Sequence, residues 1–319
     1  MFDLMAQLQS NIDAEHSLRN KLRLVSAIKH MPERAVFYAH WHDKSGPSLH
    51  ETAETNSPNA IVKLFLGERA VERLEGEVQA LCVRAGLLGV SGPARAAEFL
   101  FCRPNLSLYA TRLCPGHTGT LSLKLDAAPP DYLIQGAAMW LAEIIRRNHS
   151  INGLAGNYWR KVLNQDAPLS ASEERAASKF EKLHDKVREV AYMALPAASG
   201  PVTQSPGHGD FQLGNLIYDE NTVYAIDFHA QNRRPVAQEI AYFLIRTNAF
   251  SDTQGSTLGL NDRLIAPFRT ILPEGELDRL LPFFLGVELL NSFKRCEHWS
   301  ERAVYRRNKM AERYVASMS

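Results

Sequence analysis

Apolar residues near the start of the chain recur at intervals of three and four positions. The members of this pattern are Leu4, Leu8 and Ile12, followed by Leu18, Leu22 and Val25. Because this spacing places side chains on one face of an amphipathic helix, residues 2–31 are predicted to form one or two helices. Pro32 ends the pattern, since proline cannot continue a helix interior.

After Pro32 the pattern changes to short apolar runs that are typical of strands. The predicted strands cover residues 35–42, 60–66, 97–103 and 106–113. Residues 68–85 have apolar positions along one helical face and are predicted to form a helix with Gly86 as its C-cap. The polar stretch 43–59, which contains Gly, Pro, Ser and Asn, predicts a long hairpin or a loop.

The second half of the chain is predicted to be mainly helical. Helices are expected over residues 130–147 and 172–194, and again from Val236 to the end. A linker rich in Gly, Pro and Ser at 195–207 leads into a predicted hairpin. Its strands cover residues 216–218 and 223–228.

The chain length agrees with an organisation in two parts. At roughly 150 residues per domain, the 319 residues correspond to about two domains. The break at Cys114-Pro115-Gly116 separates a β-rich part with an N-terminal helical extension, residues 1–114, from a mainly helical part, residues 115–319. The predicted fold class is therefore α+β.

The composition narrows the class of protein further. Hydrophobic residues make up 45% and charged residues 22% of the chain, and the formal net charge is +1. These values exclude a fully disordered or collagen-like chain and do not favour nucleic acid or a membrane surface as a partner. The four cysteines form no CxxC pair, and no apolar run is long enough to cross a membrane. We expect a cytoplasmic protein with free thiols.

A single lysine interrupts the strongly apolar predicted strand AIVKLFL at residues 60–66. Because a buried charge requires a counter-charge, Lys63 is a candidate for holding nucleotide phosphates. A glutamate of the following helix would orient it, with Glu77 as the first candidate and Glu75 as the second. The alternative is a lysine that points to solvent from an edge strand.

The segment HGDFQLGN at residues 208–215 carries more specific chemistry. Asn215 follows Asp210 by five positions, and Asp227 follows Asn215 by twelve, at the end of the predicted hairpin. Phosphoryl transfer needs a carboxylate that orients the attacking hydroxyl and oxygen ligands that hold Mg²⁺ on the phosphates. This order of residues, with Lys63 upstream, predicts a kinase-like site. The alternative is that the same polar groups only cap turns.

These residues resemble the motifs of the aminoglycoside phosphotransferase/choline kinase family of small-molecule kinases. The resemblance rests on Lys63 in AIVKLF, Glu77 in EVQAL, HGDFQLGN at 208–215 and IDF at 226–228, and it follows the order of elements over about residues 35–250. It implies a bilobal protein-kinase-like fold with a small β-rich N-terminal lobe and a larger helical C-terminal lobe, and with ATP bound between them.

The resemblance also implies a role for each matching residue. Asp210 corresponds to the catalytic base, and Asn215 and Asp227 correspond to the Mg²⁺ ligands. Lys63 corresponds to the phosphate-binding lysine and Glu77 to its ion-pair partner. Lys63, Glu77, Asn215 and Asp227 would together bind Mg·ATP, with GTP as a possible replacement. The histidine of the HGD motif would support the loop, and residues 108–115 would form the hinge between the lobes.

The sequence departs from the family pattern at three places. No glycine-rich loop is seen between Ala35 and Asn59, where Ser45-Gly46 is the only pair of small residues. Phe228 and His229 follow the second aspartate. Glu239, with one extra residue before it, stands where the family has an aspartate.

Charged residues near the C-terminus bear on the acceptor. Residues 294–313 contain seven Lys or Arg and three acids. If they line the acceptor site, a neutral or anionic acceptor fits better than a polycationic aminoglycoside; a solvated helix face is the alternative. Arg233 and Arg234 are candidates for contacting a phosphate or an anionic acceptor, or else belong to a basic surface loop. Trp299 and Tyr305 are candidate partners for a cation such as choline.

The leading hypothesis is an ATP-dependent, Mg²⁺-requiring kinase that phosphorylates a hydroxyl of a small molecule such as a sugar or an amino alcohol. The alternative is a catalytically silent kinase-like protein that binds a nucleotide or a metabolite, as the missing glycine loop and the Asp-Phe-His sequence suggest. A third hypothesis is an aminoglycoside resistance kinase. The sequence leaves the acceptor and the oligomeric state open.

Overall fold

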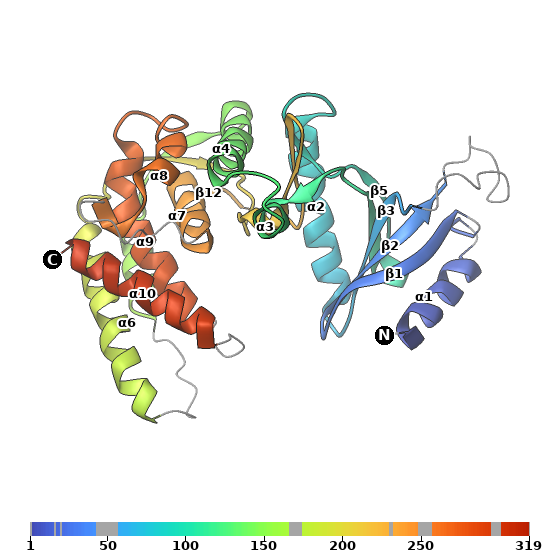
Figure 1. Ribbon diagram of the computed structural model, residues 1–319, viewed down its shortest axis with the longest axis horizontal. Helices are drawn as coiled ribbons and strands as arrows, with labels where there is room; N and C mark the ends of the chain where they lie inside the picture. Colours follow the sequence, from blue (N-terminus) through green and yellow to red (C-terminus); the bar gives the residue numbers. More distant parts are fainter. Residues whose placement is uncertain are drawn as a thin grey trace.

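The computed structural model describes most of the chain as two parts joined side by side, a β-rich part and a helical part (Figure 1). The described residues are 2–15, 17–19, 21–42, 57–165, 174–229, 232–247, 257–294 and 301–318. The predicted α+β fold, with its sheet in the N-terminal region and its helices in the C-terminal region, is confirmed. Most of the polar stretch 43–59, together with Cys296 and Trp299, lies outside the described residues.

The β-rich part is built on a five-stranded antiparallel sheet. In spatial order its strands are β1 (Leu22–Met31), β2 (Arg34–Trp41), β3 (Ala60–Phe65), β6 (Leu108–Arg112) and β5 (Phe99–Arg103). Helix α1 (Phe2–Ala14) lies on the outer side of this sheet, and helix α2 (Ala70–Leu88) lies on the side that faces the rest of the molecule (Figure 1). Leu8 and Ile12 of α1 are buried in a core of their own with the strands.

The prediction of one or two helices over residues 2–31 is wrong for residues 22–31, which form strand β1. Leu22 and Leu24 are buried, whereas Val25 is 39% exposed. Irregularities in the pairing with β2 interrupt the two-residue alternation between Leu24 and Ser26 and again farther along. Bulges of this kind hide the strand period in the sequence and leave a spacing that imitates a helix.

Because residues 22–31 form strand β1, the first hairpin turn of the sheet lies at Pro32 and Glu33. Met31 and Arg34 face each other across this turn. This short turn is therefore the loop that connects the first two strands of the sheet. It contains no glycine. The segment between Ala35 and Asn59, where the family pattern predicts a glycine-rich loop, instead begins within β2.

Helix α2 is longer than predicted. It continues through Gly86 to Leu88 and ends at Gly89, whose φ of 73° is in the left-handed region. The prediction of Gly86 as the C-cap is therefore wrong. A glycine costs only about 1 kcal/mol inside a helix, and the burial of Leu88 at 1% exposure favours continuation.

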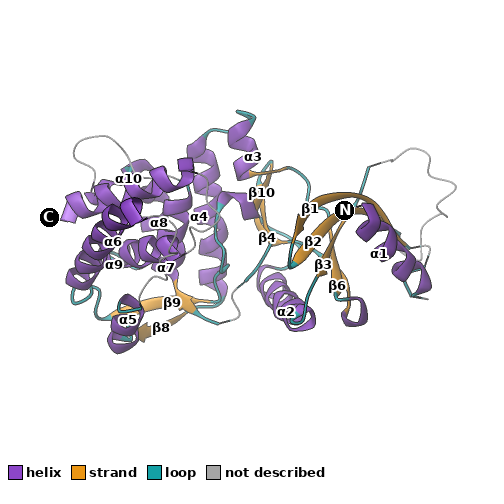
Figure 2. Cartoon of the chain, turned by 90° about the horizontal axis from the view of Figure 1, so that it is seen from below, coloured by secondary structure: helices purple, strands orange, loops and turns teal. Residues whose placement is uncertain are grey.

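The described residues form two further small sheets, and one of them lies between the β-rich part and the helical part (Figure 2). This sheet contains β4 (Ala94–Ala96), β11 (Thr222–Ala225), β10 (Leu216–Asp219) and β7 (His117–Thr118), in that order. Strands β10 and β11 form the predicted hairpin. The other contains β12 (Arg234–Pro235), β9 (Pro201–Ser205) and β8 (Ser150–Gly153). The segment predicted as a linker thus contributes strand β9.

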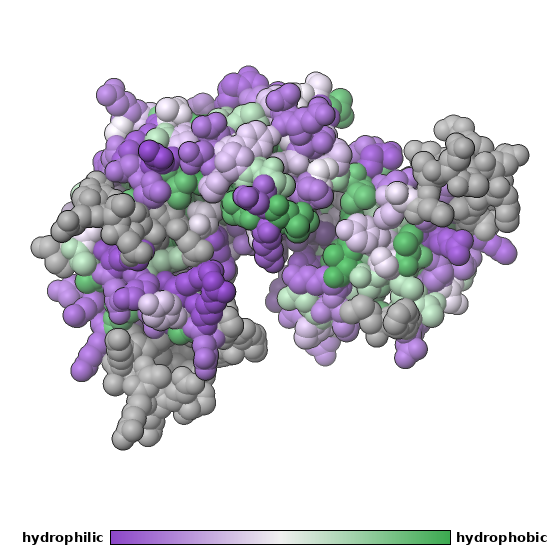
Figure 3. Space-filling view, in the orientation of Figure 1, coloured by the Kyte–Doolittle hydropathy of each residue, from purple (hydrophilic) through white to green (hydrophobic). Residues whose placement is uncertain are grey.

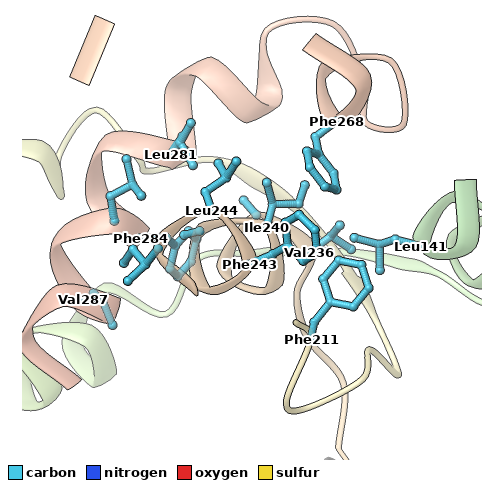
Figure 4. Close-up of a cluster of buried hydrophobic side chains, with 14 of the residues drawn as sticks. Leu141, Phe211, Val236, Ile240, Phe243, Leu244, Phe268, Leu281, Phe284 and Val287 are labelled. Atoms are coloured by element: carbon cyan, nitrogen blue, oxygen red, sulfur yellow. The ribbon is translucent and has the colours of Figure 1, made fainter. Parts of the chain in front are cut away.

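The helical part packs around one large apolar core. Its helices are α3 (Gly119–Lys124), α4 (Pro130–Arg147), α5 (Gly156–Leu163), α6 (Glu174–Ala194), α7 (Val236–Arg246), α8 (Asp262–Arg269), α9 (Glu276–Lys294) and α10 (Glu301–Met318), with short 3-10 turns η2 (Leu213–Asn215) and η3 (Thr257–Gly259). A further 3-10 turn, η1 (Pro104–Leu106), joins β5 to β6 in the β-rich part. Figure 4 shows Phe211, from the loop before η2, pointing toward Val236 of α7 and Leu141 of α4, and its ring centroid lies 5.0 Å from that of Phe243.

The remaining sequence-based expectations concern thiols and membranes. Cys82, Cys102 and Cys114 are free thiols, and burial raises the pKa of Cys114 to about 12. Among the described helices, none combines the length and the apolar character that a membrane crossing requires. The division of the chain near residue 114 stays a prediction. The chain leaves β6 and reaches β7 through residues 113–116.

Gly116 in this connection tests how tightly the two parts are joined. A Cβ atom at Gly116 would lie 2.0 Å from the carbonyl oxygen of Tyr218, and its φ is 89°. We expect Gly116→Ala to lower the free energy of unfolding by roughly 2–5 kcal/mol, because strain and overlap with backbone add. Gly89→Ala is the matched control, since Gly89 also has a positive φ but open space around it. Urea unfolding of both variants measures the difference, and equal losses would contradict the close approach.

Candidate active site

Lys63 lies in a central strand. Strand β3 is paired with β2 on one side and β6 on the other, and Lys63 is only 6% exposed. Val62 and Leu64 point into the core shared with α1, so the two-residue period of a strand places Lys63 on the opposite face. The alternative of an outward-pointing lysine on an edge strand is therefore wrong.

Two carboxylates meet the Lys63 ammonium group. Its Nζ donates to Glu77 Oε1 at 2.5 Å and also contacts Asp227 Oδ1. The hydroxyl of Tyr109, which faces Lys63 across the β3–β6 pair, donates to the same Glu77 oxygen at 2.6 Å. Glu77 rather than the exposed Glu75 is thus the carboxylate that reaches the lysine. The structure brings three of the predicted site residues into one cluster.

The charges of this cluster stabilise one another. Burial alone would lower the pKa of Lys63, but Tyr109, Asp227 and Glu77 together hold it well above its usual value. Burial alone would raise the pKa of Asp227, but Lys63 and Arg34 hold it well below its usual value. Both groups are therefore charged at neutral pH. Asp227 has a φ of 61°, a left-handed conformation that aspartate tolerates better than most residues.

Arg34 is a second cation at this cluster, and the sequence analysis did not single it out. Its Nη1 lies 3.5 Å from Glu77 Oε2 and its Nη2 lies 3.7 Å from Asp227 Oδ2. The residue is the first of strand β2, directly after the turn at Pro32 and Glu33. Because residues 2–31 were predicted to be helical, this turn was not predicted. No pattern in the sequence therefore pointed to Arg34 beside it.

Asp210 accepts hydrogen bonds on both carboxylate oxygens. Tyr242 of α7 donates its hydroxyl to Oδ1 at 2.5 Å, while Asn215 Nδ2 and Gln212 Nε2 donate to Oδ2 at 2.8 and 2.9 Å. Burial opposes ionisation of Asp210, but these hydrogen bonds outweigh it and lower its pKa. Asp210 is therefore ionised at neutral pH, and its Oδ1 accepts the hydrogen bond of the Tyr242 hydroxyl.

Backbone hydrogen bonds place the two groups of residues next to each other. Ile226 N donates to Asn215 O at 3.0 Å, and His229 N donates to His208 O at 3.1 Å. Asp227 lies between the two donors, so its carboxylate belongs to the same edge as Asn215. The cluster of Lys63, Glu77 and Asp227 and the loop with Asp210 and Asn215 therefore lie next to each other, where the β-rich part meets the helical part.

Asn215 and Asp227 offer the oxygen atoms that a divalent cation requires. Asn215 directs Nδ2 to the Asp210 carbonyl and carboxylate, which leaves Oδ1 as the amide atom that it can present to a metal. Asp227 is ionised, and amide and carboxylate oxygens are the ligands that Mg²⁺ prefers. Within the described residues, no group of three or more His, Cys, Asp and Glu side chains forms a metal site. Two protein ligands completed by phosphate oxygens are typical of Mg²⁺ in phosphoryl transfer.

Two buried charged residues hold the loop that carries Asp210. Glu239 of α7 accepts hydrogen bonds from His208 N at 3.0 Å and from Gly209 N at 3.1 Å. Arg84 of α2, 1% exposed, donates its Nε to Gly207 O at 2.9 Å and its Nη2 to the carbonyl of Pro206. Helices from both parts of the molecule therefore fix the same loop.

His208 supports the loop from within the core. Its ring lies 4.7 Å from that of Phe228 and 5.7 Å from that of Trp140, measured between centroids. Burial lowers its pKa to about 4, so the ring is neutral at physiological pH. Its Nδ1 faces Asp210 N at 3.4 Å. These contacts agree with the predicted supporting role.

A cavity of about 620 Å³ opens beside the charged cluster. Its walls come from the β1–β2 turn, from α2 and from the segment after Asp227, and they include Arg34, Phe65, Glu77, Phe228 and His229. In the space-filling view the surface is hollowed between the β-rich and helical parts (Figure 3). A nucleotide phosphate chain that reached Lys63 would lie against this cavity.

Three of the other basic residues singled out from the sequence have structural partners. Arg234 Nη1 lies 3.1 Å from Glu239 Oε1, and Arg233 contacts Asn148. Arg307 of α10 is buried against the ring of Phe293, at 4.4 Å from its centroid. Helix α10 packs on α6, α9 and η3. Tyr305 is 63% exposed.

A β-sheet lobe with a buried Lys–Glu pair, joined to a helical lobe with an Asp–Asn loop and a following Asp, defines a protein-kinase-like fold. The chain belongs to the phosphotransferase enzyme family (APH): residues 50–266, more than half of its length, match that family. The resemblance to the aminoglycoside phosphotransferase/choline kinase family is thereby confirmed. A search of the curated proteins found no match.

Solved structures of low sequence identity share the fold. A thermostable mutant of aminoglycoside phosphotransferase APH(4)-Ia, in a ternary complex with AMP-PNP and hygromycin B, is 11% identical over 98% of each chain, with a TM-score of 0.59. A choline/ethanolamine kinase family protein from Mesorhizobium loti is 12% identical over 98% of each chain, with a TM-score of 0.54. A putative fructosamine-3-kinase from Thermobifida fusca is 13% identical over 96% of this chain and 98% of its own, with a TM-score of 0.55.

The burial of His208 predicts a pH-dependent stability. Its pKa is about 4 in the folded chain against an ordinary 6.5. Between these two pH values the unfolded chain binds a proton at His208 and the folded chain does not. The free energy of unfolding is therefore complete above pH 6.5 and falls by about 3 kcal/mol as the pH drops to 4. His208→Gln should remove this part of the pH dependence in urea unfolding measured from pH 7 to 4.

His117→Gln, at an exposed position, is the control for this measurement, because it leaves His208 in place. The same slope in wild-type protein and His208→Gln would show that His208 takes up its proton while the chain is still folded.

Proposed function

We propose that the chain transfers the γ-phosphoryl group of ATP, with Mg²⁺, to a hydroxyl group of a small molecule. The observation that carries the proposal is the convergence of the cluster around Lys63 with the Asp210–Asn215 loop, through the hydrogen bond from Ile226 N to Asn215 O. Family membership supports phosphotransferase chemistry. The structure of APH(4)-Ia with AMP-PNP supports ATP as the nucleotide, with GTP as a possible replacement.

Each residue at this edge has a role in the proposal. Lys63, oriented by Glu77, holds the phosphates of the nucleotide. Asn215 and Asp227 would hold Mg²⁺, which supplies charge neutralisation on the phosphates. Asp210 orients the acceptor hydroxyl and accepts its proton as the new P–O bond forms and the bond to ADP breaks.

The acceptor is proposed to be a neutral or anionic hydroxyl compound rather than a polycationic aminoglycoside. The guanidinium carbon of Arg246 lies 5.1 Å from the centroid of the Tyr242 ring, and Tyr242 contacts Asp210. Arg246 thus places a positive charge beside the tyrosine that contacts Asp210, and a positive charge there disfavours a polycation. Arg246 supports this choice more directly than the basic residues of α10, because it lies on the helix that touches Asp210.

Replacement of the two aspartates tests the proposal. Asp210→Asn should lower kcat by about 10²- to 10⁴-fold and leave the Kd of Mg·ATP nearly unchanged, because the lost interaction acts in the transition state. Asp227→Asn should weaken Mg·ATP binding and abolish the Mg²⁺ dependence of the thermal shift, while asparagine tolerates the left-handed backbone. Calorimetry, thermal shift with ATP and GTP, and a screen of sugars and amino alcohols provide the measurements.

The same measurements separate the proposal from its alternative. Bound nucleotide stabilises the folded chain by roughly 2.7 kcal/mol at a hundred times Kd, so binding is visible without an acceptor. Mg·ATP binding without turnover of any acceptor would favour the silent kinase-like protein. The absence of a shift with either nucleotide would contradict both. Increased aminoglycoside tolerance on expression, abolished by Asp210→Ala, would instead support a resistance kinase.

Tyr242 is proposed to position Asp210, since its hydroxyl occupies the oxygen Oδ1. Contact with Tyr242 contributes to the lowered pKa of Asp210, so Tyr242→Phe should raise that pKa. The acidic limb of the pH–rate profile should therefore move to higher pH, while the Kd of Mg·ATP stays the same. Tyr305→Phe, at an exposed tyrosine of α10, is the control. An unmoved acidic limb in Tyr242→Phe would show that the hydroxyl does not act on the base.

A further inference from the structure

The turn between β1 and β2 offers little backbone to a phosphate chain. In protein kinases a glycine-rich loop covers the phosphates, and glycine lets the backbone approach them closely. Here Met31, Pro32, Glu33 and Arg34 form the turn. None of them is glycine, and Pro32 has no N–H to donate. A nucleotide bound beneath this turn therefore needs another source of positive charge.

Arg34 is placed to supply that charge. Strand β2 pairs with β3 so that Val36 faces Lys63, and Arg34, two residues from Val36, shares the face that carries Lys63. Its side chain is 17% exposed and borders the cavity beside Glu77 and Phe228. The guanidinium is thus buried enough to act in a reduced dielectric and open enough to meet a ligand.

Arg34 is held more loosely than Lys63. It lies 3.5 and 3.7 Å from the oxygens of Glu77 and Asp227, whereas Lys63 Nζ is 2.5 Å from Glu77. At the longer separations the attraction is coulombic, and the planar donors of the guanidinium are available for a bidentate contact with phosphate.

We propose that Arg34 is a second phosphate-binding cation, which replaces the backbone contacts of a glycine-rich loop and recognises the triphosphate of the nucleotide. The proposal rests on the proposed function and names a binding residue beyond those of the family motifs. Lys63 and Arg34 now face Glu77 and Asp227, two cations against two carboxylates.

Nucleotide binding by Arg34→Ala tests this proposal. Calorimetry with ATP, ADP, adenosine and inorganic tripolyphosphate, each with Mg²⁺ and with EDTA, gives the affinities for the full chain. We expect Arg34→Ala to weaken ATP and tripolyphosphate binding by about 10- to 100-fold, ADP binding by less, and adenosine binding not at all. The loss should persist in EDTA, because the contact is made with phosphate and not through the metal ligand. Arg34→Lys should restore part of it.

Arg69→Ala is the matched control. Arg69 lies in the same lobe and its side chain is 73% exposed in an ion pair with Glu72, so its loss should leave all four affinities unchanged. Thermal unfolding establishes that each variant is folded.

The possible results separate the two proposals. If wild-type protein binds no nucleotide, the proposed function itself fails. If wild-type protein binds ATP and Arg34→Ala binds it equally well, only the role of Arg34 is overturned. An equal loss for adenosine and ATP, or a loss confined to Mg²⁺, would likewise overturn it, because Arg34 would then act through the shape of the site or through Asp227.

Discussion

A lysine ammonium group beneath the sheet must be neutralised, and this requirement organises the site. Removing a charge from water costs several kcal/mol even after relaxation, and Lys63 is 6% exposed. Its partners Glu77 and Asp227 come from α2 and from the end of the β10–β11 hairpin. One buried charge thus joins three segments that are far apart in the chain. Loss of either carboxylate leaves a buried ammonium group only partly paired, so each segment fixes the place of the other two.

Helix α2 carries a second buried connection to the helical lobe. Arg84 follows Glu77 by seven positions, two turns along the same face of the helix. Glu77 meets Lys63, whereas Arg84 donates to the carbonyls of Pro206 and Gly207 just before the HGD motif. A shift of α2 along its axis would therefore disturb the lysine and the loop of Asp210 together. One rigid element therefore sets the geometry of the Lys63 cluster and of the loop that carries Asp210.

Local sequence predicted those parts of the site in which chemistry and chain order coincide. Asp210, Asn215 and Asp227 lie within one loop and hairpin, whereas the apolar run around Lys63 left a paired lysine and a solvent-facing lysine both open. The bulged strand β1 escaped prediction because its bulges remove the two-residue period. Arg34 was not predicted as a site residue for the same reason, since it directly follows the turn at the end of β1. Tyr242 could not be predicted either, since its contact with Asp210 depends on how α7 packs beneath the loop.

One of the three departures from the family pattern, Glu239, occurs where the loop needs a charge more than a fixed side-chain shape. Glu239 replaces an aspartate with one residue inserted before it, and the longer side chain still delivers a carboxylate to His208 N and Gly209 N. A carboxylate can accept those N–H groups from several approaches because both oxygens serve as acceptors. Asp227 has no such freedom. Its left-handed backbone, its contact with Lys63 and its place beside Asn215 fix the carboxylate in one position. The backbone N–H groups of the loop can therefore be held by a carboxylate from more than one approach, whereas the carboxylate of Asp227 is held in one position.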